Sequence, residues 1–116
     1  MAERPTGAVT FLFTDVEGST QAWENNPSGM AADLETHDRV LREAIDSHGG
    51  FVFATGGDSF SAAFSSPTMA LSAAVEAQRA LIASACRLRV RMGVHSGEAV
   101  ERDGNYFGPA LNRPPG

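Results

Sequence analysis

Two aspartates stand where the sequence changes from apolar to small polar residues. Asp15 follows the apolar run at positions 8–14, and Asp58 follows the pair Gly56-Gly57. A short run of apolar, β-branched and aromatic residues predicts a buried strand, and a Gly-Gly pair predicts a tight hairpin turn. If the two strands are neighbours, Asp15 and Asp58 converge. Two carboxylates that hold Mg²⁺ against a triphosphate are suited to phosphoryl or nucleotidyl transfer.

The segment after Asp15 offers a second kind of contact. Its residues are Val16, Glu17, Gly18, Ser19 and Thr20. Backbone amides at a helix N-terminus favour phosphate binding, and a glycine there permits a close approach of the backbone. Plainer interpretations stay open, because an aspartate after a strand is most often a helix cap and a Gly-Gly-Asp turn is most often only a turn.

The spacing of apolar residues indicates which elements carry these groups. We expect a short helix capped by Ser19 or Thr20 and a later helix that begins at Ser66-Pro67. The residues Leu88, Val90, Met92 and Val94 alternate with arginines, which predicts a strand with one apolar face. The full expectation is strands at 8–14, 51–55, 59–64 and 88–94, a further short strand near 98–101, and helices near 20–24, 30–47 and 66–84.

The order of these elements predicts an α+β fold of the ferredoxin-like palm type (βααββαβ). Helices between strands imply crossovers and adjacent strands imply a hairpin, which suits a mixed sheet with helices on one face. The helix at 66–84 is expected to bury one face. That face comprises Leu71, Ala74, Val75, Gln78, Leu81 and Ile82.

Composition narrows the class of protein. The chain has 116 residues, 42% of them hydrophobic, so it can bury a core. Its net charge of −5 argues against a nucleic-acid partner. The lone cysteine, Cys86, forms no intrachain disulfide, and no apolar run reaches the ~20 residues that a membrane span needs. We therefore expect a cytoplasmic protein without a membrane segment.

Four blocks of this sequence together resemble class III adenylyl and guanylyl (nucleotidyl) cyclases, in the form of the short actinobacterial domains. Family members convert a nucleoside triphosphate, here ATP by resemblance, to the 3′,5′-cyclic monophosphate and pyrophosphate. They use two metal ions, Mg²⁺ or Mn²⁺, in cyclic-nucleotide signalling, and two protomers pair head to tail. The blocks are residues 11–20, 55–60, 93–98 and 106–113.

The resemblance implies specific roles. Asp15 and Asp58 would bind the metals, with the carbonyl of Val16 as a further ligand. The amides of residues 16 to 20 would bind the phosphates, and Asn112 would orient the ribose from the opposite protomer.

Three positions depart from the family pattern. Ala54 stands at the position of the adenine-reading lysine, and Asn105 at that of its base-reading partner, commonly aspartate. Gly116 stands at the position of the transition-state arginine, which Arg113 is poorly placed to replace. Losing such an electrostatic contact costs on the order of 10²-fold in rate.

These departures leave several interpretations open. The chain is expected to comprise an N-terminal arm (1–7), a partial, C-terminally truncated cyclase domain (8–113) and a tail (114–116). It is an enzyme of the adenylyl cyclase type, or a weakly active or inactive relative that binds metal-nucleotide or acts as an interaction module. A diguanylate cyclase and a purely structural domain are weaker alternatives.

Overall fold

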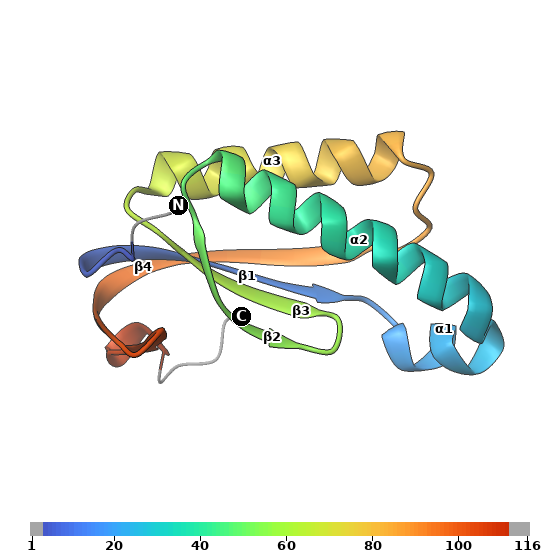
Figure 1. Ribbon diagram of the computed structural model, residues 1–116, viewed down its shortest axis with the longest axis horizontal. Helices are drawn as coiled ribbons and strands as arrows, with labels where there is room; N and C mark the ends of the chain where they lie inside the picture. The colour runs from blue at the N-terminus through green and yellow to red at the C-terminus, as the bar shows by residue number, and fades with distance from the viewer. Residues whose placement is uncertain (1–3, 112–116) are drawn as a thin grey trace.

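Strand β1 forms the centre of a five-stranded sheet that carries its helices on one face (Figure 1). The computed structural model describes residues 4–111. The elements are β1 (Gly7–Val16), α1 (Ser19–Asn25), α2 (Pro27–Ser47), β2 (Phe51–Gly56), β3 (Ser59–Phe64), α3 (Pro67–Ala83), β4 (Val90–Arg102), β5 (Asn105–Phe107) and the 3₁₀ turn η1 (Pro109–Leu111).

The strand order is β2-β3-β1-β4-β5, and every pairing between neighbours is antiparallel in the described range. The predicted α+β class with helices on one face is confirmed, but the prediction of a mixed sheet is wrong. The reason lies in the crossovers. The connection from β1 to β2 passes over the position of β3, and the connection from β3 to β4 passes over β1. Each pair of parallel strands is therefore separated by an antiparallel one.

Helix starts follow from local side-chain chemistry. Pro67 begins α3, and the hydroxyl of Ser66 accepts a hydrogen bond of 3.2 Å from the amide of Met69, as the sequence predicts. Helix α2 begins three residues earlier than predicted, because the side chain of Asn26 caps it by accepting from the amide of Gly29 at 3.1 Å. Helices α2 and α3 thus begin where a polar side chain satisfies a free amide.

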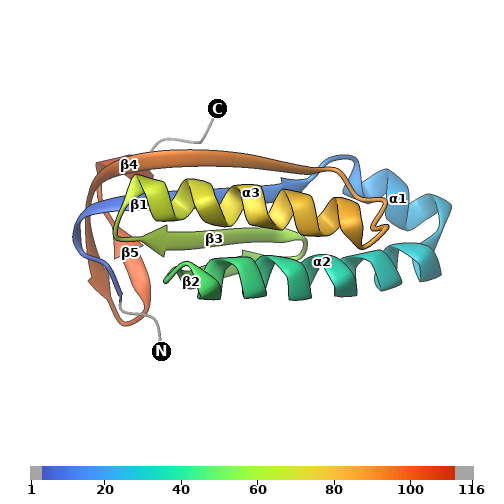
Figure 2. The same cartoon turned by 90° about the horizontal axis from the view of Figure 1, so that it is seen from above.

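Helices α2 and α3 lie side by side along the sheet (Figure 2) and enclose the main core against it. A second cluster lies on the opposite face. There β4, a single strand where two were expected, bends and carries β5 beneath the sheet towards β2. This face holds Val9, Phe11, Ala63, Ala99 and Tyr106.

The buried face of α3 differs from the prediction. Small residues face the sheet, namely Ala70, Ala73 and Ala77, together with Leu81. Leu71, Val75 and Ile82 are exposed, the last by 79%. Close packing of helix on sheet accommodates alanine, so the larger apolar residues face outward.

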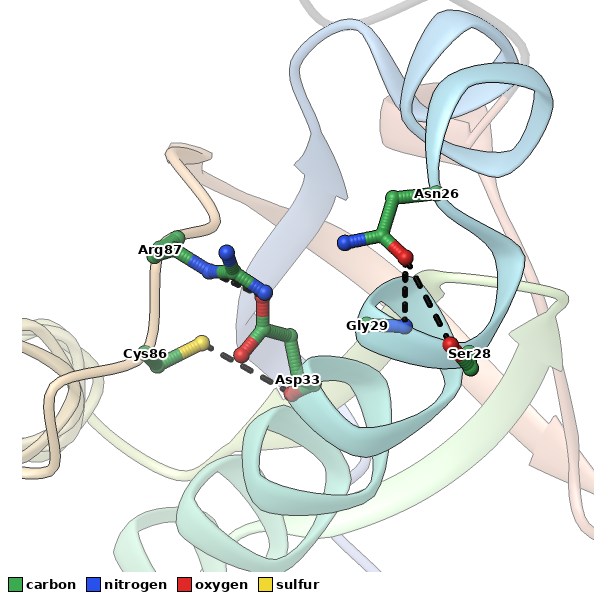
Figure 3. A network of polar contacts seen from close by, with 6 residues as sticks. All are labelled: Asn26, Ser28, Gly29, Asp33, Cys86 and Arg87. Atoms are coloured by element: carbon green, nitrogen blue, oxygen red, sulfur yellow. Dashed lines mark hydrogen bonds and ion pairs between the residues drawn. The ribbon is translucent and has the colours of Figure 1, made fainter.

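The loop before β4 is tied to α2 (Figure 3). The Nε of Arg87 donates to a carboxylate oxygen of Asp33 at 3.2 Å, and the thiol of Cys86 donates to the carbonyl of Asp33 at 3.6 Å. These contacts fix the place where β4 starts.

Candidate functional site

A pocket of about 580 Å³ lies where the ends of β1, β3 and β4 stand side by side. Alternate residues of a strand point to opposite faces of the sheet. Leu12 and Val16 belong to the core beneath the helices, so Phe13 and Asp15 face the other side. The polar residues of the pocket on this face are Asp15, Ser59, Ser61 and Arg91.

Arg91 holds Asp15 by two parallel hydrogen bonds. Its Nε donates to Oδ1 and its Nη2 donates to Oδ2, both at 2.8 Å. The two residues are direct partners in the β1–β4 register. The hydrogen bond and the charge of Asp15 raise the pKa of Arg91 above its ordinary value. Both side chains are accessible, Asp15 by 48% and Arg91 by 63%.

Sequence reasoning did not find Arg91. The alternation of arginines with apolar residues placed it on the polar face of a strand. Its partner, however, depends on the register between strands 76 positions apart in the chain. Only a prediction of that register could have paired it with Asp15.

Asp58 lies in the turn between β2 and β3, as the Gly-Gly pair predicts. Gly57 adopts the left-handed conformation with φ of 64°, and Ser59 closes the turn by donating to the carbonyl of Gly56 at 3.0 Å. Because Thr14 pairs with Phe60, Asp15 and Asp58 lie at the same end of neighbouring strands. No group of three or more acidic, histidine or cysteine side chains poised for a metal occurs in residues 4–111.

The backbone groups after Asp15 differ in whether they are hydrogen-bonded to the neighbouring chain segment. The amide of Glu17 donates to the carbonyl of Arg89 at 2.8 Å. This makes Val16 and Val90 a non-hydrogen-bonded pair, so the peptide groups of Val16 point away from β4. The carbonyl of Val16 is thus directed towards the β3 side, whereas the amide of Glu17 is occupied within the protein.

Helix α1 begins without the predicted cap. Gly18 takes the cap position with φ of 67°, no side-chain cap bond forms, and its carbonyl accepts from the amide of Ala22 at 3.0 Å. The expectation that Ser19 or Thr20 caps the helix is therefore wrong, because both lie inside its first turn. First-turn amides have no partner within a helix.

The predicted base-reading positions lie on different strands, β2 and β5. Ala54 is exposed on β2 and pairs with Ser61, a residue of the pocket. Asn105 is exposed at the β4–β5 turn. Arg91, the partner of Asp15, and Arg102, the partner of Asn105, lie towards opposite ends of β4, and Asn105 does not line the pocket that holds Asp15. Asn112, Arg113 and Gly116 lie outside the described residues.

The donor chemistry of this end of the sheet suits a hard divalent cation. Asp15 and Asp58 supply carboxylates, and Val16 supplies a carbonyl directed away from its β4 neighbour. These donors are all oxygens, and Mg²⁺ is bound through one or two carboxylates while waters and phosphates complete its shell. The carboxylate of Asp15 can bind such a cation once the cation replaces its hydrogen bonds from Arg91.

None of the helices within residues 4–111 combines the length and the hydrophobicity that crossing a bilayer requires.

The sequence is similar to those of known nucleotide cyclases. The family model described as the adenylate and guanylate cyclase catalytic domain matches residues 1–104. An uncharacterised protein of Mycobacterium tuberculosis is 43% identical over 111 residues, covering 94% of this chain and 38% of the relative. An adenylate cyclase of Neurospora crassa is 34% identical, covering 94% of this chain and 6% of the relative. The chain thus spans well under half the length of these curated relatives.

Solved structures agree with the sequence comparison. Adenylate cyclases from Trypanosoma brucei in their monomeric state include one that superposes with a TM-score of 0.78 at 28% identity, covering 97% of this chain and 68% of that one. An adenylate/guanylate cyclase/hydrolase from Silicibacter pomeroyi gives a TM-score of 0.79 at 28% identity, with coverages of 90% and 65%. This chain therefore belongs to the family of adenylate and guanylate cyclase catalytic domains.

Proposed function

We propose that this domain converts a nucleoside triphosphate to its 3′,5′-cyclic monophosphate and pyrophosphate. The observation that carries the proposal is the half-exposed carboxylate of Asp15 in the pocket between β1, β3 and β4, with Asp58 at the same end of the neighbouring strand. Membership of the cyclase family supports the same reaction. Cyclisation by elimination of pyrophosphate makes the enzyme a phosphorus–oxygen lyase.

Asp15, Asp58 and the carbonyl of Val16 would hold two divalent cations, Mg²⁺ or Mn²⁺. Bound there, the metals would promote ionisation of the ribose 3′-hydroxyl and neutralise charge on the triphosphate. The amides of Gly18, Ser19 and Thr20 would bind phosphate oxygens, because they precede or open a helix. The amide of Glu17 is omitted from this set, since it is bonded to Arg89.

A second protomer would complete the site. Asn105 stands at the opposite end of β4 from Asp15, so a head-to-tail pair could bring the Asn105 end of one chain to the Asp15 pocket of the other. Asn112 would orient the ribose across the same interface. The proposal therefore includes a homodimer with two composite sites.

The substrate proposed is ATP, and cyclic AMP the product, within cyclic-nucleotide signalling. The support is that several relatives are named adenylate cyclases. Ala54 offers no side-chain hydrogen bond to a base, whereas Asn105 can both donate and accept.

A second candidate is a domain that binds metal-nucleotide with little or no turnover. Ala54 and Asn105 favour it, because both replace side chains that the family uses to read the base. Gly116, at the position of the transition-state arginine, favours it as well.

A comparison of turnover with binding separates the two candidates. Product formation from ATP and from GTP is measured with Mg²⁺ and with Mn²⁺, beside calorimetry of nucleotide binding. Asp15→Asn should lower turnover by about 10²-fold or more. Asp46→Asn, at an exposed position on α2, is the matched control and should have no effect. Nucleotide binding without product formation supports the binding-only domain. If the protein neither binds nucleotide nor forms product, both candidate functions are rejected.

A further inference from the structure

We propose that Arg91 and a divalent cation compete for the carboxylate of Asp15, so that the metal-free domain is held in a self-blocked state. The inference rests on the proposed function, since it concerns the same carboxylate. Both oxygens of Asp15 accept a hydrogen bond from Arg91, at 2.8 Å each. A cation that takes either oxygen as a ligand must displace one of these bonds.

The ion pair between Asp15 and Arg91 is one that a cation can readily replace. Bidentate geometry makes the arginine specific for this carboxylate, but Asp15 and Arg91 are 48% and 63% exposed. Ion pairs that are open to water contribute little to stability. Breaking this contact should therefore leave the fold intact while it frees the carboxylate.

A second ion pair in the same protein provides a contrast. Arg87 binds Asp33, whose side chain is only 18% exposed and whose carbonyl also accepts from Cys86 (Figure 3). The pair of Arg87 and Asp33 joins the loop before β4 to α2 and so has a structural role. The pair of Asp15 and Arg91 joins two strands whose register is already fixed by ten paired positions.

Arg91 also has another carboxylate within electrostatic reach once Asp15 is taken. The charge of Glu17 contributes to the raised pKa of Arg91, after the hydrogen bond and charge of Asp15. The guanidinium can therefore shift towards Glu17 without entering an apolar environment. Glu17 thus gives the released guanidinium a second carboxylate nearby.

The test measures Mn²⁺ binding by electron paramagnetic resonance in the full chain without nucleotide. Arg91→Gln removes the competing donor, and Arg89→Gln is the matched control, because it removes the same charge at an exposed position two residues earlier, just before β4 begins. Arg91→Gln should bind Mn²⁺ about two- to fivefold more tightly than Arg89→Gln, the range expected when a weak exposed pair is lost. Arg91→Lys retains the charge but loses the bidentate fork, so it should fall between wild type and Arg91→Gln.

A second readout follows the arginine itself. In wild type, the ¹⁵Nε signal of Arg91 should shift on titration with Mg²⁺, and the shift should saturate with the metal-binding curve. Equal Mn²⁺ affinity in Arg91→Gln and Arg89→Gln, with a static ¹⁵Nε signal, would overturn the competition while leaving the metal site intact.

Asp15→Asn separates this failure from that of the proposed function. If Asp15→Asn binds Mn²⁺ as tightly as wild type does, the cation does not use Asp15, and the cyclase proposal and the competition both fail. If Asp15→Asn loses binding, the result supports the metal site, and the comparison of the arginine variants decides on the competition.

Discussion

Tyr106 of β5 lies edge-on against Phe53 of β2, with the ring centroids 4.9 Å apart and the planes at 60°. These two strands are the opposite edges of the five-stranded sheet. They can meet only because β4 bends and carries β5 under the face that the helices leave uncovered. The same contact buries the phenol of Tyr106, whose oxygen finds no hydrogen-bond partner among residues 4–111.

Burial raises the pKa of Tyr106 to about 12, with a smaller contribution from the negative charge of Glu101. Because the folded state favours the neutral phenol, this group stabilises the fold below pH ~10, and the contribution is lost as the pH rises from about 10 through 12. The chain has one tyrosine, so phenolate absorbance near 295 nm reports this group alone. We expect a midpoint near 12 in the native protein and near 10 in urea. A native midpoint near 10 would place the phenol in water.

Gly50 should not tolerate a side chain. A Cβ there would lie 2.6 Å from the ring of Phe64 and 2.7 Å from a methyl group of Ile45, both fully buried. Gly50→Ala should lower the free energy of unfolding by about 1–3 kcal/mol, the usual cost of overpacking a core. Urea denaturation measures this loss. Gly56→Ala is the control, because its Cβ would meet only the flexible hydroxyl of Ser59 at 3.2 Å. Equal effects of the two variants would contradict the prediction.

The start of α3 depends on one hydroxyl. The oxygen of Ser66 accepts from the amide of Met69, so Ser66→Ala should cost about 1 kcal/mol of stability. Ser65→Ala serves as the neighbouring control, because the hydroxyl of Ser65 contacts only the sulfur of Met69 at 3.7 Å. Thermal unfolding of both variants provides the comparison, and a loss in Ser65→Ala alone would refute the cap assignment.

Thr14 carries a buried hydroxyl without a hydrogen-bond partner in the part of the chain that the structure describes. Thr14→Val replaces it with a methyl group of similar shape. An unsatisfied buried polar group is destabilising, so the variant should be as stable as wild type or more stable by about 1 kcal/mol. Chemical denaturation would show this. A clear loss of stability would mean that a buried water satisfies the hydroxyl.

Local chemistry explains which parts of this fold the sequence could predict. Ser66 and Pro67 specify a helix start within two residues, and Gly56-Gly57 specify a turn, so both features were predicted correctly. The buried face of α3 was predicted correctly only at Leu81 and, in part, at Ala74, because grouping by hydrophobicity favoured Leu71 and Ile82 over the small alanines that close packing requires.

The candidate site shows the same division between local and long-range information. The positions of Asp15 and Asp58 at strand ends follow from short runs of residues. The partner of Asp15 does not, since Arg91 reaches it only through the register of β1 with β4. The antiparallel character of every pairing was also missed, because it depends on which strand each crossover passes over.

The central position of β1 has a consequence for the order of synthesis. Residues 7–16 leave the ribosome before both of their neighbours, β3 and β4, and Gly7 finds its partner only in Ala99. Pairing between such distant segments slows folding, because a long loop must close before any contact forms. An apolar strand with an unpaired edge is prone to pair with other chains. Strand β1 is therefore enclosed on both sides only after the whole of β4 has emerged.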